Sequence, residues 1–249
     1  MKIIQKSQEK VSFVTEADQS LLNAIRRSAL EIPVLAIDEV EFHKNDSVLY
    51  DEILALRLAL VPIETPKNMN MQEKCSCKGK GCARCSVQFK LVAKGPCTVY
   101  SKELKGKTKP VYPDIPLGIL IEGQELELIA RAKLGKGIEH TKFSPGLVYY
   151  RNVAEIEVDK ECKKCRSCTD ACPQNILKLD EDKIVVSDKY KCDFCEACVE
   201  ACKREGKNMI RINPGKELIF FIESWGQIKA ADILAGAVKA LKENLKAVE

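Results

Sequence analysis

Two cysteine-rich stretches, CKKCRSCTDACP at residues 162–173 and CDFCEACVEACK at residues 192–203, decide the fold of the segment around them. Both have the spacing C-x2-C-x2-C-x3-C, and they begin 30 residues apart. This internal repeat is the most specific signal in the chain. It is typical of loops that hold [4Fe–4S] clusters, because two-residue spacers let one tight turn present three thiolates to three irons.

The repeat predicts two [4Fe–4S] clusters with crossed ligands. In two-cluster ferredoxins the fourth cysteine of each run ligates the cluster of the other run. Pro173 ends the first run as in ferredoxins, whereas Lys203 stands at the equivalent place in the second. One cluster would take Cys162, Cys165, Cys168 and Cys202, and the other would take Cys192, Cys195, Cys198 and Cys172.

The spacing leaves two other interpretations open, a single retained cluster or zinc in place of iron. Zinc sites usually come as two C-x2-C pairs, which disfavours zinc here. Between the runs, ILKLDEDKIVVSD at residues 176–188 predicts a hairpin whose three adjacent acids form a solvated tip rather than a magnesium site. Basic side chains beside the ligands can offset the negative charge of a cluster: Lys163, Lys164, Arg166, Lys203 and Arg204.

A third cysteine group, CSCKGKGCARC at residues 75–85, has a different spacing and cannot form half of a ferredoxin. Gly79 and Gly81 permit a turn tight enough to gather four sulfurs around one ion, so we expect a structural zinc site. A redox-active pair or reduced loop thiols are the alternatives. The remaining cysteine, Cys97, is expected to be a small packed residue. The expected zinc ligands are Cys75, Cys77, Cys82 and Cys85.

Composition excludes several classes of protein. The 249 residues include 13 cysteines, an odd number, and the first ten residues lack the apolar core of a secretory signal. No run approaches the roughly 18 apolar residues of a membrane span. We therefore expect a cytoplasmic protein with reduced, metal-binding thiols. A net charge of +4 is too small to indicate a nucleic-acid surface, and sequence-specific contact with nucleic acid is not expected.

The N-terminal region predicts a strand, a turn and a helix. Thr15 and Asp18 form a capping signature, apolar residues then recur at helical spacing, and Pro33 ends the run. The polar side of this helix carries Asn23, Arg26 and Arg27. Spacing alone favours a solvated face for these three residues.

The C-terminal region predicts a strand at residues 217–225 and a helix that opens at Gly226. Apolar residues follow one another at alternating intervals of three and four, which gives a narrow stripe along one side of the helix. Such a stripe fits ordinary core packing and fits equally well a helix that packs on a partner subunit. It consists of Ala231, Leu234, Val238, Leu241, Leu245 and Val248.

The middle of the chain reads as scaffold. Residues 34–42 alternate like a strand, and residues 50–62 predict a helix that is apolar almost all round and therefore buried. Segments 86–99 and 117–133 are typical of an antiparallel β domain, and residues 103–116 of an exposed loop between them. His140 has no nucleophile or general base beside it in the sequence, so we expect it to be a structural residue or a local hydrogen bonder.

These pieces together resemble the D family of archaeal RNA polymerase subunits, related to bacterial α and to the third subunit of eukaryotic polymerase II. The resemblance covers essentially the whole chain, with the ferredoxin-like module as an insertion that some archaeal members carry. It rests on LLNAIRRSALEIPVLAIDEVEF (21–42), YDEILALRLALVPI (50–63), CSCKGKGCARC (75–85), GIEHTKFSP (137–145) and the strand and helix at 217–249.

The resemblance implies an α+β fold with three parts. Residues 1–35 plus 214–249 would form a discontinuous α-like dimerisation domain, residues 36–154 an inserted β domain, and residues 155–213 the ferredoxin-like module. The small α-like subunit L would pair with the helices at 18–32 and 228–248. Asn23, Arg26 and Arg27 match the family's assembly helix, which reverses the preference for a solvated face. Further expected partners are subunits N and P and the two large catalytic subunits.

Two functions of different class remain at this stage. The first is a non-catalytic assembly subunit of DNA-directed RNA polymerase, in which the clusters hold the inserted module in shape and their oxidation could tune assembly. The second is a ferredoxin-type electron-transfer subunit of an oxidoreductase. The second does not account for the terminal helices or the four-cysteine loop. No three-aspartate magnesium loop is present in the sequence, so no catalytic residue is expected.

Overall fold

The computed structural model describes residues 1–162, 165–181 and 183–247. The chain is mixed α+β with antiparallel sheets, as the sequence predicts. Its internal contacts divide it into two compact units. The first unit comprises Met1–Ile4, Ser12–Gln19 and Tyr150–Phe220, and the second comprises Gln5–Val11, Ser20–Tyr149 and Phe221–Glu249.

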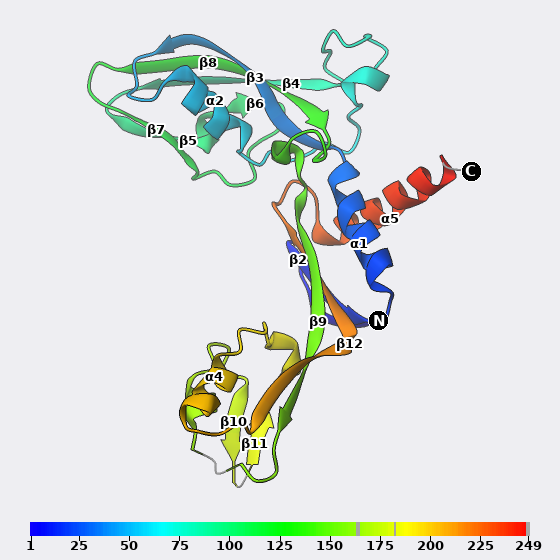
Figure 1. The fold of residues 1–249 in the computed structure, drawn as a ribbon. Helices are drawn as coiled ribbons and strands as arrows, with labels where there is room; N and C mark the ends of the chain where they lie inside the picture. Colours follow the sequence, from blue (N-terminus) through cyan, green and yellow to red (C-terminus); the bar gives the residue numbers. More distant parts are fainter. Residues whose placement is uncertain (163–164, 182, 248–249) are drawn as a thin grey trace. The chain divides into compact units, whose positions relative to one another are not determined.

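A four-stranded sheet with the order β3-β8-β4-β6 forms the β domain of the second unit (Figure 1). Alternate residues of β8 are buried, among them Leu126, Leu128 and Ala130, because successive side chains of a strand point to opposite faces. The buried face packs with Phe89 into the main hydrophobic core. The strands are β3 (Val34–Asn45), β8 (Glu125–Gly135), β4 (Ser86–Lys94) and β6 (Lys105–Gly106).

The same core is covered by one helix, α2 (Asp51–Ala59), and by the paired strands β5 (Cys97–Tyr100) and β7 (Pro116–Leu120) (Figure 1). Leu54 and Leu58 of α2 are buried. The expectation of a helix buried all round is wrong, since Ile53, Leu56 and Leu60 are 44%, 54% and 56% exposed. A nine-residue helix that packs on one side of a sheet leaves its other side uncovered, whatever residues stand there.

The expected exposed loop at residues 103–116 is only partly exposed. Leu104 and Pro110 are buried, and β6 lies within this loop and pairs with β4. Ile63 forms an isolated bridge with Pro110. The loop is therefore tied to the core at two points. Short 3-10 turns elsewhere in the chain are η1 (Ala29–Glu31), η2 (Gln72–Lys74), η3 (Ser101–Glu103), η4 (Thr141–Phe143) and η5 (Lys189–Lys191).

Helix α1 (Gln19–Ser28) continues into η1 and ends ahead of Pro33, after which β3 begins. The hydroxyl oxygen of Thr15 accepts a hydrogen bond from the N–H of Ala17, only two residues on, and closes a turn ahead of the helix.

Helix α5 (Ala230–Lys246) packs against η1 within the second unit, where Gly236 allows a close approach to Ile32. The expected start of this helix at Gly226 is wrong. Gly226 has a φ of +88°, in the left-handed region that glycine tolerates, and the helix begins four residues later. Val248, the last residue of the predicted stripe, lies outside the described residues.

The first unit contains the cysteine repeat. Strands β10 (Leu177–Asp180) and β11 (Lys183–Val186) form the predicted antiparallel hairpin, next to helices α3 (Ser167–Asp170) and α4 (Ala197–Arg204) (Figure 1). The third acid of the hairpin tip, Asp182, lies outside the described residues. A four-stranded sheet has the order β1-β2-β12-β9, with β1 (Lys2–Lys6), β2 (Lys10–Thr15), β12 (Ile210–Ser224) and β9 (Gly146–Val158).

None of the described helices combines the length and the apolar character needed to cross a membrane.

Candidate metal centres and helix surface

The four-cysteine loop gathers its sulfurs into one small group. All four Sγ atoms lie within 4.8 Å of one another. The Cys75–Cys82 and Cys77–Cys85 distances are both 3.5 Å, and Cys82–Cys85 is 3.9 Å. A tetrahedral zinc ion with Zn–S bonds of about 2.3 Å requires sulfurs about 3.8 Å apart. The donor set therefore fits a zinc ion in number, chemistry and spacing.

Backbone conformation brings these sulfurs together. Lys78, Gly79 and Gly81 have φ values of 52°, 82° and 75°, which fold the segment between Cys77 and Cys82 into a tight turn. Gly79 and Gly81 thus have the role that the sequence predicts, whereas the left-handed Lys78 is unexpected for a residue with a side chain. Gln72 supports the turn, since its side-chain amide donates a 2.9 Å hydrogen bond to the carbonyl of Gly79.

The thiols of this group differ in acidity. Burial raises the pKa of Cys85 to about 12. Burial also acts to raise the pKa of Cys77, but the hydrogen bond with Cys85 and the backbone N–H of Cys82 outweigh it and lower that pKa to about 6. Cys77 thus favours the thiolate form, while Cys85 keeps its proton. A divalent cation that binds the four sulfurs would displace that proton.

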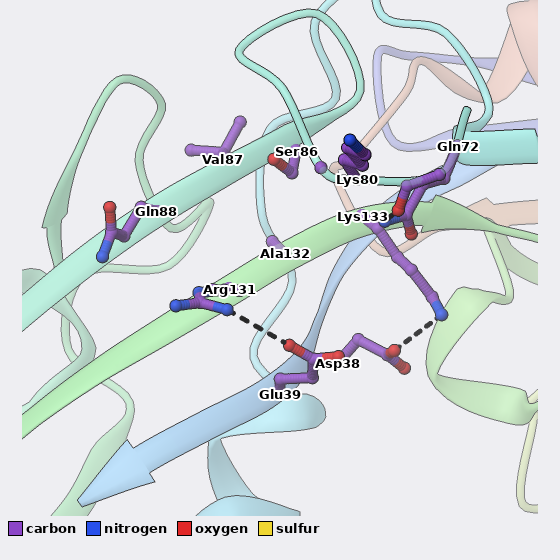
Figure 2. A pocket seen from close by; sticks show the side chains of 12 residues that line it. Asp38, Glu39, Gln72, Lys80, Ser86, Val87, Gln88, Arg131, Ala132 and Lys133 are labelled. Carbon is purple, nitrogen blue, oxygen red and sulfur yellow. Dashed lines mark hydrogen bonds and ion pairs between the residues drawn. The ribbon is translucent and has the colours of Figure 1, made fainter. Parts of the chain in front are cut away.

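A polar groove of about 460 Å³ lies beside the four-cysteine loop (Figure 2). Lys80 and Gln72 of the loop region line one side of it, and residues of the sheet line the other. Figure 2 shows two ion pairs on the sheet side, Lys133–Asp38 at 2.7 Å and Arg131–Glu39 at 3.8 Å. The groove offers charges of both signs to a polar ligand or protein segment.

In the first unit, a small cavity is lined by four cysteines of one predicted set, Cys172, Cys192, Cys195 and Cys198. Its other walls are apolar apart from Gln174 and Asp193. Burial raises the pKa of Cys198 to about 11, and the nearby thiols of Cys172 and Cys192 add to that rise. This donor set, brought together from both runs, fits an apolar-walled cluster site.

The cysteines of the other predicted set are also close together. Burial raises the pKa of Cys168, and the neighbouring thiols of Cys162, Cys165 and Cys202 add to that rise. The backbone N–H of Met209 donates a 3.4 Å hydrogen bond to Cys202 Sγ. Two of the predicted basic neighbours, Lys163 and Lys164, lie outside the described residues.

These cysteines also form much of the interior of the first unit. Cys168, Cys172, Cys192, Cys198 and Cys202 are all buried, in one cluster with Ile176, Leu177 and Ile210. A segment this short has too few aliphatic residues to build such an interior without them. The interior of the repeat is therefore built around potential metal ligands.

The predicted assembly residues lie on α1 and α5. Asn23 Oδ1 accepts hydrogen bonds from Nε and an Nη of Arg26 at 3.1 and 2.9 Å, and Arg27 is exposed. On α5 the buried residues are Ala230, Ile233 and Ala237, which form a stripe next to the predicted one. The predicted stripe is half-buried at Leu234, Val238 and Leu241 and is 60% exposed at Leu245.

Sequence reasoning missed an apolar groove of about 500 Å³ on the β domain. It is lined mostly by Val48, Leu49, Leu117, Ile119 and Ile121, three of which are more than 60% exposed. The apolar helix predicted at residues 50–62 was the feature of the sequence that could have indicated this groove, because an excess of apolar residues can mark an outer surface as well as a core.

The last two residues with a predicted role are Cys97 and His140. Cys97 is exposed, with its Sγ 3.4 Å from the carbonyl of Lys94, so the expectation of a packed residue is wrong. It stands at the start of β5, where its side chain falls on the outer face. His140 is a local hydrogen bonder as predicted, since its Nδ1 accepts from the N–H of Lys142.

Two family descriptions match the chain. "RNA polymerase Rpb3/RpoA insert domain" matches residues 40–149, and "4Fe-4S dicluster domain" matches residues 154–203. The first covers the β domain with the four-cysteine loop, and the second covers the cysteine repeat. Along the sequence, the segment that matches the iron–sulfur domain follows the segment that matches the polymerase insert domain.

Curated relatives match over nearly the full length. DNA-directed RNA polymerase subunit Rpo3 of Archaeoglobus fulgidus is 36% identical, over 97% of this chain and 93% of the relative. The Rpo3 subunits of Methanosphaera stadtmanae and Methanothermobacter thermautotrophicus are 37% and 39% identical, over 98% and 96% of this chain and 94% and 93% of theirs. With these matches along its whole length, and with a polymerase insert domain inside it, the chain belongs to the family of archaeal DNA-directed RNA polymerase subunit Rpo3.

Proposed function

We propose that this chain is an assembly subunit of an archaeal DNA-directed RNA polymerase and pairs with the small α-like subunit L. The heterodimer is the platform on which subunits N and P and the two large catalytic subunits assemble. Residues 1–35 plus 214–249 form its dimerisation domain, residues 36–154 the inserted domain and residues 155–213 the ferredoxin-like domain. The insert-domain and dicluster matches, at residues 40–149 and 154–203, support this division.

The observation that carries the proposal is the second apolar stripe of α5. A helix that served only its own core would need one such stripe, and Ala230, Ile233 and Ala237 already provide it. Leu241 and Leu245 lie on the neighbouring stripe, and Leu245 is 60% exposed. Apolar side chains at intervals of three and four along an exposed line are what a partner helix buries.

Charge substitution tests this surface. Leu241→Glu combined with Leu245→Glu places two carboxylates in the proposed helix–helix contact, where desolvation would oppose pairing. We expect the variant to lose the heterodimer when it is co-expressed with subunit L and analysed by size-exclusion chromatography. Lys239→Glu is the matched control, because Lys239 is exposed on the opposite side of α5 and should leave the heterodimer intact. Equal heterodimer yields for the two variants would overturn the proposal.

The clusters have a structural role in this proposal. One [4Fe–4S] cluster is held by Cys162, Cys165, Cys168 and Cys202, and the other by Cys172, Cys192, Cys195 and Cys198. The grouping of thiols around Cys168 and Cys198 supports these sets. Metal binding can contribute folding free energy of order 10 kcal/mol to a small domain, judged from structural zinc sites. Loss of the clusters on oxidation would loosen the domain and tune assembly.

Serine substitution separates this role from simple packing. With Cys165→Ser and Cys195→Ser together, we expect lower yields of the polymerase complex, and a wild-type yield that falls on exposure to oxygen. Complex yields that are unchanged in both comparisons would contradict a stabilising or redox-tuning role for the clusters.

The four-cysteine loop binds zinc in this proposal, through Cys75, Cys77, Cys82 and Cys85. Sulfur distances of 3.5–3.9 Å support a closed tetrahedral site. The zinc holds the loop against the polar groove of Figure 2, and the loop, together with the apolar groove by Ile119 and Ile121, contacts other polymerase subunits.

The chain supplies no catalytic residue and no sequence-specific contact with nucleic acid, and it works in the cytoplasm. Its relatives are named DNA-directed RNA polymerase subunit Rpo3 and match 97% and 98% of this chain, well beyond the cysteine repeat. This full-length match disfavours the alternative of a ferredoxin-type electron-transfer subunit, for which only the dicluster domain speaks.

A further inference from the structure

Gln227 is a buried polar residue in the turn at residues 224–228, which follows β12 and leads to α5. Its side-chain amide donates a 3.2 Å hydrogen bond to the carbonyl of Leu35, near the start of β3. Its other polar atom, Oε1, is also buried and has no hydrogen-bond partner among the described residues. A buried carbonyl without a partner costs free energy, so the net stabilisation that this glutamine can contribute is small. A reason other than stability is therefore needed for an amide at this position.

Thr65 completes a closed ring of hydrogen bonds with Gln227 and Leu35. The N–H of Thr65 donates a 3.3 Å hydrogen bond to the backbone carbonyl of Gln227. The hydroxyl oxygen of Thr65 accepts a 3.0 Å hydrogen bond from the N–H of Leu35. The third bond of the ring is that from the Gln227 amide to the carbonyl of Leu35. Leu35 and Thr65 both lie in the part of the chain that forms the β domain, so the ring joins the turn at residues 224–228 to that domain.

Gly226 brings the backbone of the turn against a second part of the β domain. A Cβ at this position would overlap with Cγ1 of Val111. Val111 belongs to the loop at residues 103–116, which is itself tied to the core of the β domain. The turn is also closed internally, because the hydroxyl of Ser224 donates to the carbonyl of Ile228 and accepts a 2.8 Å hydrogen bond from the N–H of Gly226.

The apolar contacts of the turn have a different effect from the ring. Ile228 packs against a buried cluster of Val34, Ala36 and Phe143. Apolar burial is non-directional, so this contact holds the turn close to the β domain without fixing its angle. A hydrogen bond weakens steeply when its donor and acceptor are misaligned, and buried polar networks specify one arrangement of the groups around them. The ring therefore fixes the angle of the turn as well as its distance.

We propose that Gln227 is a positioning residue that fixes the direction in which α5 leaves the β domain. The helix carries the apolar stripe with Leu241 and Leu245, and the β domain carries the four-cysteine loop and both grooves. A subunit that presents these surfaces to different partners at the same time needs a fixed angle between them. This role in assembly rests on the proposed function, whereas the fixed angle itself does not.

A pulsed electron paramagnetic resonance measurement on the full chain tests the fixed angle. Lys239 on α5 and Lys90 on β4 are both exposed, and each is replaced by p-acetylphenylalanine, to which a nitroxide is attached without labelling the native cysteines. The chain with Gln227 in place should give one narrow distribution of distances. Gln227→Met keeps nearly the same shape without a hydrogen bond and should broaden the distribution. Gln5→Met, on the exposed strand β1, is the matched control and should leave it narrow, and an unchanged width in Gln227→Met would overturn the proposal.

Stability and assembly separate a positioning residue from a residue that only stabilises the fold. Gln227→Met removes the unpartnered buried carbonyl together with the hydrogen bond, so we expect the midpoint of urea denaturation to stay in place. The yield of the heterodimer with subunit L should also be unchanged, while the yield of complete polymerase on reconstitution should fall several-fold. Parallel losses of the denaturation midpoint, the heterodimer and the polymerase would make Gln227 an ordinary packing residue and overturn the proposal.

Thr65 provides a second pair of variants on the same ring. Thr65→Val removes the oxygen that accepts from the N–H of Leu35 and should broaden the distance distribution, whereas Thr65→Ser keeps an acceptor there and should leave it narrow. Equal broadening in the two variants would show that the ring does not fix the angle. If the unaltered chain fails to pair with subunit L while Gln227→Met still broadens the distribution, the proposed function fails and the fixed angle stands.

Discussion

The side-chain amide of Asn244 donates a 2.6 Å hydrogen bond to a carboxylate oxygen of Glu31. It joins the last turns of α5 to the 3-10 turn that continues α1. Two turns earlier in α5, a Cβ at Gly236 would lie 3.0 Å from Cδ1 of Ile32, so the helix is in close contact there as well. These contacts fix the two helices of the proposed dimerisation surface against one another.

A double-mutant cycle measures this tie. We expect Glu31→Ala and Asn244→Ala each to lower the free energy of unfolding by about 0.5–1.5 kcal/mol, because each removes the same hydrogen bond to a charged group at an exposed site. The double variant should then cost less than the sum, with a coupling energy of about 0.5–1 kcal/mol. Urea denaturation of the three variants checks this, and strictly additive losses would show that the bond contributes nothing.

Asp38 gives a prediction for pH dependence. Burial acts to raise its pKa, but hydrogen bonds from Lys133 and Lys142 outweigh burial and lower that pKa below its usual value. A carboxyl with a lowered pKa stabilises the fold above the unfolded-state value of about 3.9, and this stability is lost as the pH falls through the folded pKa. Asp38→Asn should cost about 1–2 kcal/mol at pH 7, by loss of charged hydrogen bonds.

The same variant should lose less stability than the wild type when the pH is lowered from about 5 to about 3, since its amide does not titrate. Urea denaturation at a series of pH values makes the comparison. Lys102–Asp114, an ion pair with both side chains at least half exposed, provides the control in Asp114→Asn, which should have little effect at any pH. Parallel pH profiles for wild type and Asp38→Asn would contradict the assignment.

Buried and exposed cysteines should respond differently to serine. Cys198 is buried beside Cys172 and Cys192, whereas Cys97 is exposed on the β domain. Cys198→Ser should remove one cluster, about four irons per chain, and make the first unit more sensitive to proteolysis. Cys97→Ser should change neither property. Iron analysis and limited proteolysis of the two variants check this, and a full iron content in Cys198→Ser would exclude Cys198 as a ligand.

Zinc and iron should be separable by mutation. Cys85→Ser removes a buried thiol of the four-cysteine loop, so the chain should lose its zinc and keep its iron. Gly79→Ala should weaken zinc retention more mildly, because φ of +82° is strained for alanine by about 1 kcal/mol. Metal analysis after dialysis against a chelator distinguishes the two variants, and zinc retention in Cys85→Ser would contradict a four-thiolate site.

Local pattern was sufficient to predict much of this molecule. The alternating runs of residues 117–133 predicted antiparallel strands, Pro33 marked the end of the first helix, and glycines marked the turn in the four-cysteine loop. Each of these features depends on near neighbours in the chain, where sequence and backbone geometry are closely linked.

Burial was harder to predict where it depends on what covers a surface. Ile53 and Leu56 look like core residues in sequence and are exposed, because apolarity does not show which side of a helix meets the sheet. Cys97 is exposed for a similar reason, because its position on strand β5, and not its residue type, decides whether its side chain is buried. Gly226 was misread as a helix start, since glycine in the left-handed region fits a bend as well as a helix boundary.

The most direct measurement of the central claim is anaerobic co-expression with subunit L, followed by size-exclusion chromatography and metal analysis of the eluted peak. The account predicts a one-to-one heterodimer with about eight irons, about eight sulfides and about one zinc for each copy of this chain. A stable monomer that elutes apart from subunit L and carries redox-active iron would contradict it.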